Sequence, residues 1–285
     1  MKSRPREQRL IRAIRTQTLI FTGAIIILLH VNFTPKNKIL TKASCRSDTI
    51  PVPEAAVGKN TAITHLAAGR EGVLICRDYY ALLYNEAREQ ADWVAYKITP
   101  EMIKGNAKRK NNFKPDPLVP EGSAHPNDYK KTVFDRGHLM PAASCKFNQK
   151  AMDETFYMSN ISPQYNYFNR GIWRLIEIQI RDWAVELGAL YIVTGPAAYF
   201  PDSVIGKNQV SVPSHYYKVV MIDDSISVHM AGFLLKNEKS SLRPRDYLVS
   251  VDSVEVFTGL DFFPELADSI ESEAEHKIDT LFQRK

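Results

Sequence analysis

Six stretches of the chain combine β-branched and aromatic residues in the pattern of buried or half-buried strands. The last two are separated only by Asp223, Asp224 and Ser225, which predicts a hairpin. A further short element, residues 156–160, ends by Pro163. The predicted strands are residues 72–80, 93–99, 132–139, 189–194, 216–222 and 226–235.

One long helix is predicted over residues 170–187, because apolar residues recur there at helical spacing and Gly188 supplies a stop. The apolar stripe consists of Ile172, Ile176, Ile180, Trp183 and Leu187. On a neighbouring face, about 100° round the helix, lie Asn169, Glu177 and Arg181. The stripe belongs in the core, so these three polar residues border whatever packs beside the helix.

The connecting segments complete a mixed domain. Residues 104–128 are polar and contain four prolines, which predicts a long surface loop. Residues 34–60 carry scattered polar residues without periodicity and are typical of a linker. Helix and strands occur in one stretch without an internal repeat, so the fold class is α+β.

The net charge of +5 resides in the N-terminal region and therefore says little about the body of the protein. Residues 1–46 hold ten Lys and Arg against one acid, Glu7, a net charge of +9. The remainder has 27 basic and 31 acidic residues, a net charge of −4. Such a body does not attract polyanions by its overall field. Binding of nucleic acid would need a local basic cluster and a bound cation.

The N-terminal region predicts export or membrane anchoring. A basic segment, residues 2–15, precedes an apolar run at residues 18–31, and no small-residue cleavage site follows closely. We expect an uncleaved signal anchor with the body on the periplasmic or extracellular side. A cleaved signal peptide and a mitochondrial targeting segment are the alternatives. The predicted division is residues 1–48 for basic segment, anchor and linker, and residues 49–285 for the catalytic domain.

The strongest chemical signal is the tetrapeptide Asp135-Arg136-Gly137-His138 within a strand-like stretch. Burying these charged groups is costly unless they pair or have a function. Alone, the tetrapeptide would fit a structural ion pair beside a core histidine. Residues 157–164 and then 169–177 follow it, and their sequences favour a functional site over a structural ion pair.

These segments together resemble the DNA/RNA non-specific endonucleases, the ββα-metal (His-Me finger) nucleases that include mitochondrial endonuclease G and secreted bacterial nucleases. The resemblance extends over residues 93–217. It implies a central mixed or antiparallel sheet flanked by helices. The matching pieces are residues 93–96 (WVAY), 113–117 (FKPDP), 135–138 (DRGH), 157–164 (YMSNISPQ), 169–177 (NRGIWRLIE), 193–196 (VTGP) and 212–219 (VPSHYYKV).

The resemblance implies a magnesium-dependent endonuclease that cuts DNA and RNA without sequence preference, with Mn²⁺ as a substitute cation. His138 matches the general base, and histidine suits that role because its unperturbed pKa lies near operating pH. Asn169 matches the metal ligand, since a neutral hard oxygen suits Mg²⁺. Glu177 matches the acid that holds metal-bound waters. Because only a neutral imidazole can accept the proton of water, we expect the rate of cleavage to rise with pH through the range in which histidine titrates.

Further residues match positions near the phosphate or the base in this family. They are Arg136 and Arg181 near the phosphate, Asn160 beside the histidine, and Arg109 before residues 113–117. Arg136 could instead pair with Asp135. The resemblance leaves open a homodimer and an inhibitor protein as partners.

The remaining histidines and cysteines do not predict a zinc site. His125, His215 and His229 lie in separate elements without paired spacing, and we expect them to be structural. The three cysteines allow at most one disulfide, and Cys145 has no predictable activating base. Two alternative functions remain: a catalytically weak nucleic-acid-binding relative, and a metal phosphodiesterase for a smaller substrate.

Overall fold

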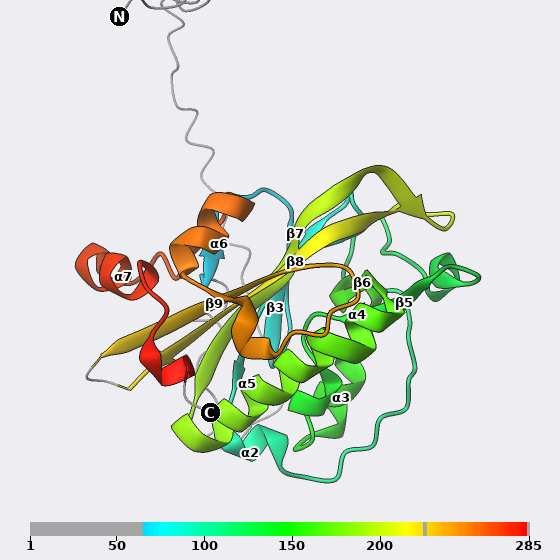
Figure 1. Cartoon of the computed structure of the whole chain (residues 1–285). Coiled ribbons are helices and arrows are strands. Elements are labelled where there is room, and N and C mark those ends of the chain that lie inside the picture. Colours follow the sequence, from blue (N-terminus) through cyan, green and yellow to red (C-terminus); the bar gives the residue numbers. More distant parts are fainter. Residues whose placement is uncertain (1–64, 225–226, 284–285) are drawn as a thin grey trace, which may run out of the picture. The chain divides into compact units, whose positions relative to one another are not determined.

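A seven-stranded sheet forms the centre of the protein, which the computed structural model describes at residues 65–224 and 227–283 (Figure 1). Its strands are β2 (Val73–Cys76), β3 (Tyr80–Asn85), β4 (Gln90–Ile98), β7 (Leu190–Ile205), β8 (Val210–Asp223), β9 (Val228–Lys236) and β10 (Leu248–Val249). The strand order is β10-β9-β8-β7-β4-β3-β2, and each pairing is antiparallel. The predicted α+β class is confirmed, with an antiparallel sheet.

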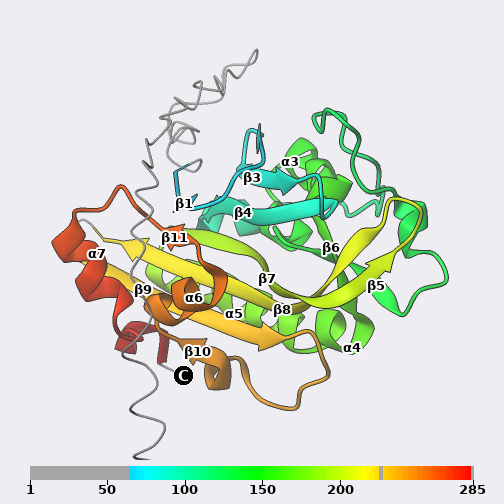
Figure 2. The ribbon, with the colours of Figure 1, turned by 90° about the horizontal axis from the view of Figure 1, so that it is seen from above.

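Each predicted strand overlaps an observed one, but some boundaries differ. Residues 72–80 divide into β2 and the start of β3, because a turn closed by the Arg77 amide and the Tyr80 carbonyl (2.8 Å) separates them. Strands β7 and β8 run well beyond the predicted ranges as a ribbon (Figure 2). The register of that ribbon shifts between Pro196 and Val204, and the prolines at 196, 201 and 213 hid it from the sequence pattern.

The sheet buries both of its faces. Residues alternate along β4, so Val94 and Tyr96 join one apolar cluster while Trp93 and Ala95 join the other. The first cluster receives the stripe of the long helix, and the second receives the helix that follows β10. The α-helices outside the site are α2 (Pro100–Ile103), α3 (Gln149–Glu154), α6 (Val251–Thr258) and α7 (Asp268–Glu275), and the long helix is α5 (Arg174–Leu187).

Beside this sheet, two short strands and a helix form a ββα unit (Figure 1). Strand β5 (Phe134–His138) pairs with β6 (Ile161–Tyr165), and β6 includes Pro163, where we had predicted the element to end. The short 3₁₀ turn Met158–Asn160 precedes β6. A second small sheet pairs β1 (Ala67–Ala68) with β11 (Asp261–Phe262) near α6.

The helical part of this unit begins earlier than predicted. It starts at α4 (Asn166–Phe168), continues through a π-helical turn (Asn169–Trp173) and passes into α5, which ends at Gly188 as expected. Within the π turn, Gly171 leaves helical geometry with φ −95° and ψ −115°. Such turns inside helices frequently occur at functional sites.

Several predictions concern residues outside the described part of the chain. The proposed anchor and the boundary at residue 49 lie there, so they stay predictions. Within residues 65–224 and 227–283, no helix has the length and apolar character needed to cross a membrane. Cys76 is disulfide-bonded, whereas Cys145 is a buried free thiol.

Candidate active site

His138 ends strand β5 and is almost completely enclosed, with 7% of its surface exposed. The rings of Phe113 and Phe156 lie 5.5 and 4.8 Å from the imidazole, centroid to centroid. Its Nε2 atom is buried and has no hydrogen-bond partner among the described residues. A buried polar atom without a partner is costly to folding, and this cost indicates a function.

Burial lowers the pKa of His138 to about 3, and the positive charge of Arg109 contributes to this shift. The imidazole is therefore neutral at physiological pH. This finding differs from our expectation of a pKa near the ordinary histidine value. The sequence shows the residue type, but the apolar enclosure depends on loop residues far away along the chain.

The glycine of the DRGH tetrapeptide has a steric explanation. Gly137 pairs with Ser162 across the β5–β6 ladder, and a Cβ atom at Gly137 would overlap the buried side chain of Gln164. Any other residue would require the buried side chain of Gln164 to move.

Asn169 lies in the π turn and is linked directly to strand β5. Its Nδ2 donates to Oδ2 of Asp135 (3.0 Å), and Arg170 donates twice to the same carboxylate (2.8 Å each). Burial raises the pKa of Asp135, but these hydrogen bonds outweigh it and leave the pKa below its usual value. Asp135 therefore pairs with Arg170 rather than Arg136, and it fixes the orientation of the Asn169 amide.

A second link joins β5 to the helix beneath the site. Trp173 Nε1 donates to the carbonyl of His138 (3.1 Å), and the Lys218 ammonium donates to the next carbonyl, that of Leu139 (3.3 Å). The same ammonium lies 4.0 Å from the centre of the Trp173 ring and donates to Thr194 Oγ1 (3.1 Å). These contacts fix the position of His138 relative to the helix that carries Asn169.

Charged groups surround Glu177 on α5. Burial raises the pKa of this carboxyl, while the charges of Lys218, Arg181, Arg109 and Arg174 oppose the shift. Burial lowers the pKa of Lys218, and Glu177 opposes that shift in turn. Arg181 carries a buried Nη1 atom that has no hydrogen-bond partner in the described part of the chain. Glu177 thus lies in a positive environment, as expected for an acid near a phosphate site.

Arg109, Arg136 and Asn160 occupy different positions relative to the base. Arg109 is close enough for its charge to lower the pKa of His138. Arg136 is exposed, and its guanidinium lies 4.5 Å from the centre of the Phe113 ring. Asn160 is fully buried, with its amide exchanging two hydrogen bonds with the Met140 backbone (2.9 and 3.0 Å). Its contacts position the segment that follows His138.

Sequence reasoning missed three contributors to this arrangement. From the sequence, Asp135 is expected only as an ion-pair partner, Trp173 carries no separate signal, and Lys218 lies inside a predicted strand. A lysine flanked by apolar residues in a strand is the available signal, because a fully buried ammonium needs partners.

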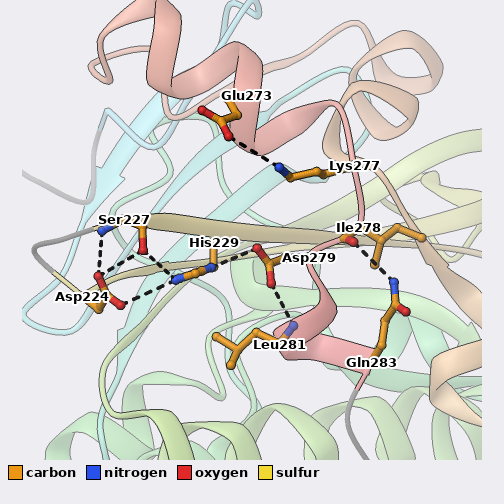
Figure 3. Close-up of polar contacts among 9 residues, drawn as sticks. All are labelled: Asp224, Ser227, His229, Glu273, Lys277, Ile278, Asp279, Leu281 and Gln283. Carbon is orange, nitrogen blue, oxygen red and sulfur yellow. Dashed lines mark hydrogen bonds and ion pairs between the residues drawn. The ribbon is translucent and has the colours of Figure 1, made fainter.

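The other histidines lie in separate elements, as predicted. His125 accepts the Asn127 amide at the start of a 3₁₀ helix, and His215 packs against the Phe257 ring at 5.2 Å. Figure 3 shows His229 between Asp224 and Asp279, at 3.5 and 2.9 Å. For Cys145, burial raises the pKa of the thiol to about 12, which leaves it an unreactive thiol.

The residues around Asn169 fit a divalent cation. Because Nδ2 of Asn169 donates to Asp135, its carbonyl oxygen is the amide atom that remains for a hard cation. The Glu177 carboxyl, partly buried and near several cations of the chain, can order water around such an ion.

Comparisons with known proteins agree with this geometry. The sequence model of the DNA/RNA non-specific endonuclease family matches residues 58–269. The human protein "Nuclease EXOG, mitochondrial" is 37% identical over 210 residues, which are 67% of this chain and 57% of the human protein. This chain therefore spans little more than half the length of that relative. A nuclease of Nostoc sp. is 30% identical over 268 residues, covering 90% of this chain and 96% of the Nostoc protein.

The structure resembles that of a solved complex. The crystal structure of an EndoG/EndoGI complex, which concerns the mechanism of EndoG inhibition, contains a chain that matches with a TM-score of 0.68 and 30% identity. The match covers 73% of this chain and 92% of the other. It confirms the ββα-metal architecture predicted from the sequence.

Proposed function

Because this chain belongs to the DNA/RNA non-specific endonuclease family, we propose that it hydrolyses phosphodiester bonds of DNA and RNA with His138 as general base and a divalent metal at Asn169. The observation that carries this proposal is the buried Nε2 atom of His138, which has no hydrogen-bond partner among the described residues. A neutral imidazole with a free ring nitrogen accepts the proton of an attacking water.

Asn169 would hold Mg²⁺, with Mn²⁺ as a substitute, and Glu177 would order water around the ion. The bound cation supplies charge neutralisation at the phosphate and assistance to the leaving 3′ oxygen. Asp135 would have a positioning role, because it holds the Asn169 amide in one orientation. Trp173 and Lys218 would likewise position the backbone, because they donate to the carbonyls of His138 and Leu139.

The arginines of the site would bind the phosphate. Arg136 is exposed beside Phe113, and the unpartnered Nη1 atom of Arg181 is a donor that a phosphate oxygen would satisfy. Arg109 adds positive charge beside His138. Asn160 positions the base rather than contacting substrate, since its amide is bonded to backbone. All of these groups address the phosphate backbone, which carries no sequence information, so we infer that cleavage is non-specific.

The N-terminal region would determine where the enzyme acts. Its basic and apolar segments support a membrane anchor with the catalytic domain, residues 49–285, outside the cytoplasm. The name of the human relative, which is called mitochondrial, supports mitochondrial targeting as the alternative. The solved EndoG/EndoGI complex, which concerns the mechanism of EndoG inhibition, supports an inhibitor protein as partner.

The proposal is tested by replacing the base. His138→Ala should reduce plasmid and RNA cleavage by about 10²- to 10⁴-fold, because a general base contributes that order of rate. Magnesium affinity should remain, and a chelator should stop the parent enzyme. His65→Ala is the matched control, since the His65 side chain is exposed and lies 3.6 Å from Glu265. A folded His138→Ala protein that cuts at the parent rate contradicts the mechanism.

A further inference from the structure

Three carboxylates from two helices converge at a place separate from the active site. Asp252 and Glu255 belong to α6, and Glu275 ends α7. One carboxylate oxygen of each lies within 4.8 Å of the others. Glu275 lies beyond residues 58–269, so the cluster extends past the part of the chain that matches the family.

Glu275 distinguishes this cluster from an ordinary acidic surface. It is 6% exposed, and its Oε1 atom is buried without a hydrogen-bond partner in the described part of the chain. Burial, together with the neighbouring carboxylates of Glu255, Glu271, Asp252 and Asp261, raises the pKa of Glu275 to about 8. An enclosed carboxylate that faces other carboxylates is unfavourable unless a cation or a proton is present.

The described contacts of the cluster supply little positive charge. The Phe262 amide donates to Glu255 Oε1 (2.8 Å), and His276 Nδ1 lies 3.4 Å from Asp252 Oδ2. The lysine next along the chain, Lys277, pairs instead with Glu273 at 3.5 Å (Figure 3). A peptide amide and one exposed histidine do not balance several carboxylates.

We propose that Asp252, Glu255 and Glu275 bind a divalent cation of the calcium type, which ties α7 to α6. The donor set contains only carboxylate oxygens, and hard cations prefer such ligands. Ca²⁺ accepts several carboxylates in flexible geometry, whereas Mg²⁺ takes one or two and keeps most of its waters. The two ligands on α6 stand three residues apart and therefore share a helix face.

The site has a structural role in this proposal. The cation would cross-link α7, near the end of the described chain, to α6, whose apolar side packs on the sheet through Val251 and Val254. Binding to the folded state alone stabilises that state by mass action. The proposed site lies on α6 and α7, and it does not depend on the proposed nuclease mechanism.

The test is thermal unfolding of the full chain in CaCl₂ and in a chelator. Ca²⁺ should raise the Tm by roughly 5–10 °C at a concentration about a hundred times its Kd. The rise should disappear in Glu275→Gln, which keeps the shape of the side chain but removes a charged ligand. Glu273→Gln is the matched control on the same helix, because the Glu273 side chain is 80% exposed and pairs with Lys277.

A second control separates this site from the active site. The Ca²⁺-dependent rise should persist in Asn169→Ala, which lacks the proposed catalytic metal ligand. If Glu275→Gln fails to fold, Asp252→Asn replaces it, since the Asp252 side chain is 45% exposed and tolerates the change. The proposal is overturned if the parent Tm does not respond to CaCl₂, or if the rise survives in the folded cluster variant.

Discussion

At the scale of single residues, the pKa of His138 depends on the groups around the ring and not only on the residue type. The sequence predicted this histidine as the base, because the tetrapeptide and the segments after it resemble a known family. It did not predict the pKa, which depends on Phe113, Phe156 and Arg109 closing around the ring. These residues come from loops and helix ends whose positions no local pattern specifies.

The low pKa makes a prediction about pH. A base with the ordinary histidine pKa would lose about tenfold in kcat/KM between about pH 7.5 and 5.5, because its neutral fraction falls by that factor. With the folded pKa lowered to about 3, the neutral base persists through this range and is lost only near that value. We therefore expect no His138-dependent loss of kcat/KM between those pH values, measured at saturating magnesium.

Glu177 provides the control for this profile. Burial raises the pKa of Glu177, so its protonation could produce an acidic limb of its own. The Glu177→Gln enzyme removes that titration. A tenfold acidic loss that remains in Glu177→Gln and disappears in His138→Ala would show that His138 titrates near its ordinary pKa.

The Asp135 carboxylate makes a separate prediction about the metal. Because it holds the Asn169 amide, Asp135→Ala should weaken magnesium affinity by about 10- to 100-fold. Arg170→Ala is the control, since Arg170 is exposed and surface ion pairs contribute little. The measurement is activity against magnesium concentration. Equal magnesium dependence in Asp135→Ala and the parent would show that the amide does not need this partner.

At the scale of elements, the sequence predicted which segments are helices and strands better than where they begin. Strands β4, β8 and β9 were found because apolar residues dominate them. The start of the helix was misplaced, because Asn166–Phe168 is too short for a periodic signal and the π turn after it interrupts the period. The part of the helix hardest to predict is therefore the part that carries Asn169.

The junction between β5 and that helix predicts a linked effect on rate and stability. Trp173→Phe removes the donor to the His138 carbonyl, and an unsatisfied buried carbonyl costs about 1–3 kcal/mol in the free energy of unfolding. Because the base then moves relative to the helix, kcat should fall on the order of ten- to a hundredfold, with magnesium affinity largely kept.

Trp183→Phe is the matched control for this variant. Trp183 lies on the same α5 helix, but its ring packs against Phe233 and Phe282, away from β5. It should lower the Tm without a comparable loss of kcat. If both variants lose stability and only stability, then Trp173 has no positioning role.

At the scale of the whole molecule, charge is distributed unevenly. The body after residue 46 has a net charge of −4, yet Arg109, Arg136 and Arg181 belong to the site region. Local cations, rather than the overall field, would therefore attract the phosphate backbone. The N-terminal 46 residues hold the basic excess, and they are the part that should face a membrane surface.

The last prediction concerns that N-terminal region. A basic segment before the apolar residues 18–31 favours a retained anchor, so the full chain made in cells should sediment with membranes and require detergent for release. Replacing Ile26 and Ile27 by Asp is the control, since two charges in the apolar run should abolish membrane retention. Fractionation should be combined with mass measurement of the N-terminus. A mature N-terminus between residues 34 and 49 would instead show cleavage of a signal or targeting segment. An intact chain recovered in the cytoplasmic fraction would reject both export and anchoring, because the same apolar run would then have engaged no membrane at all.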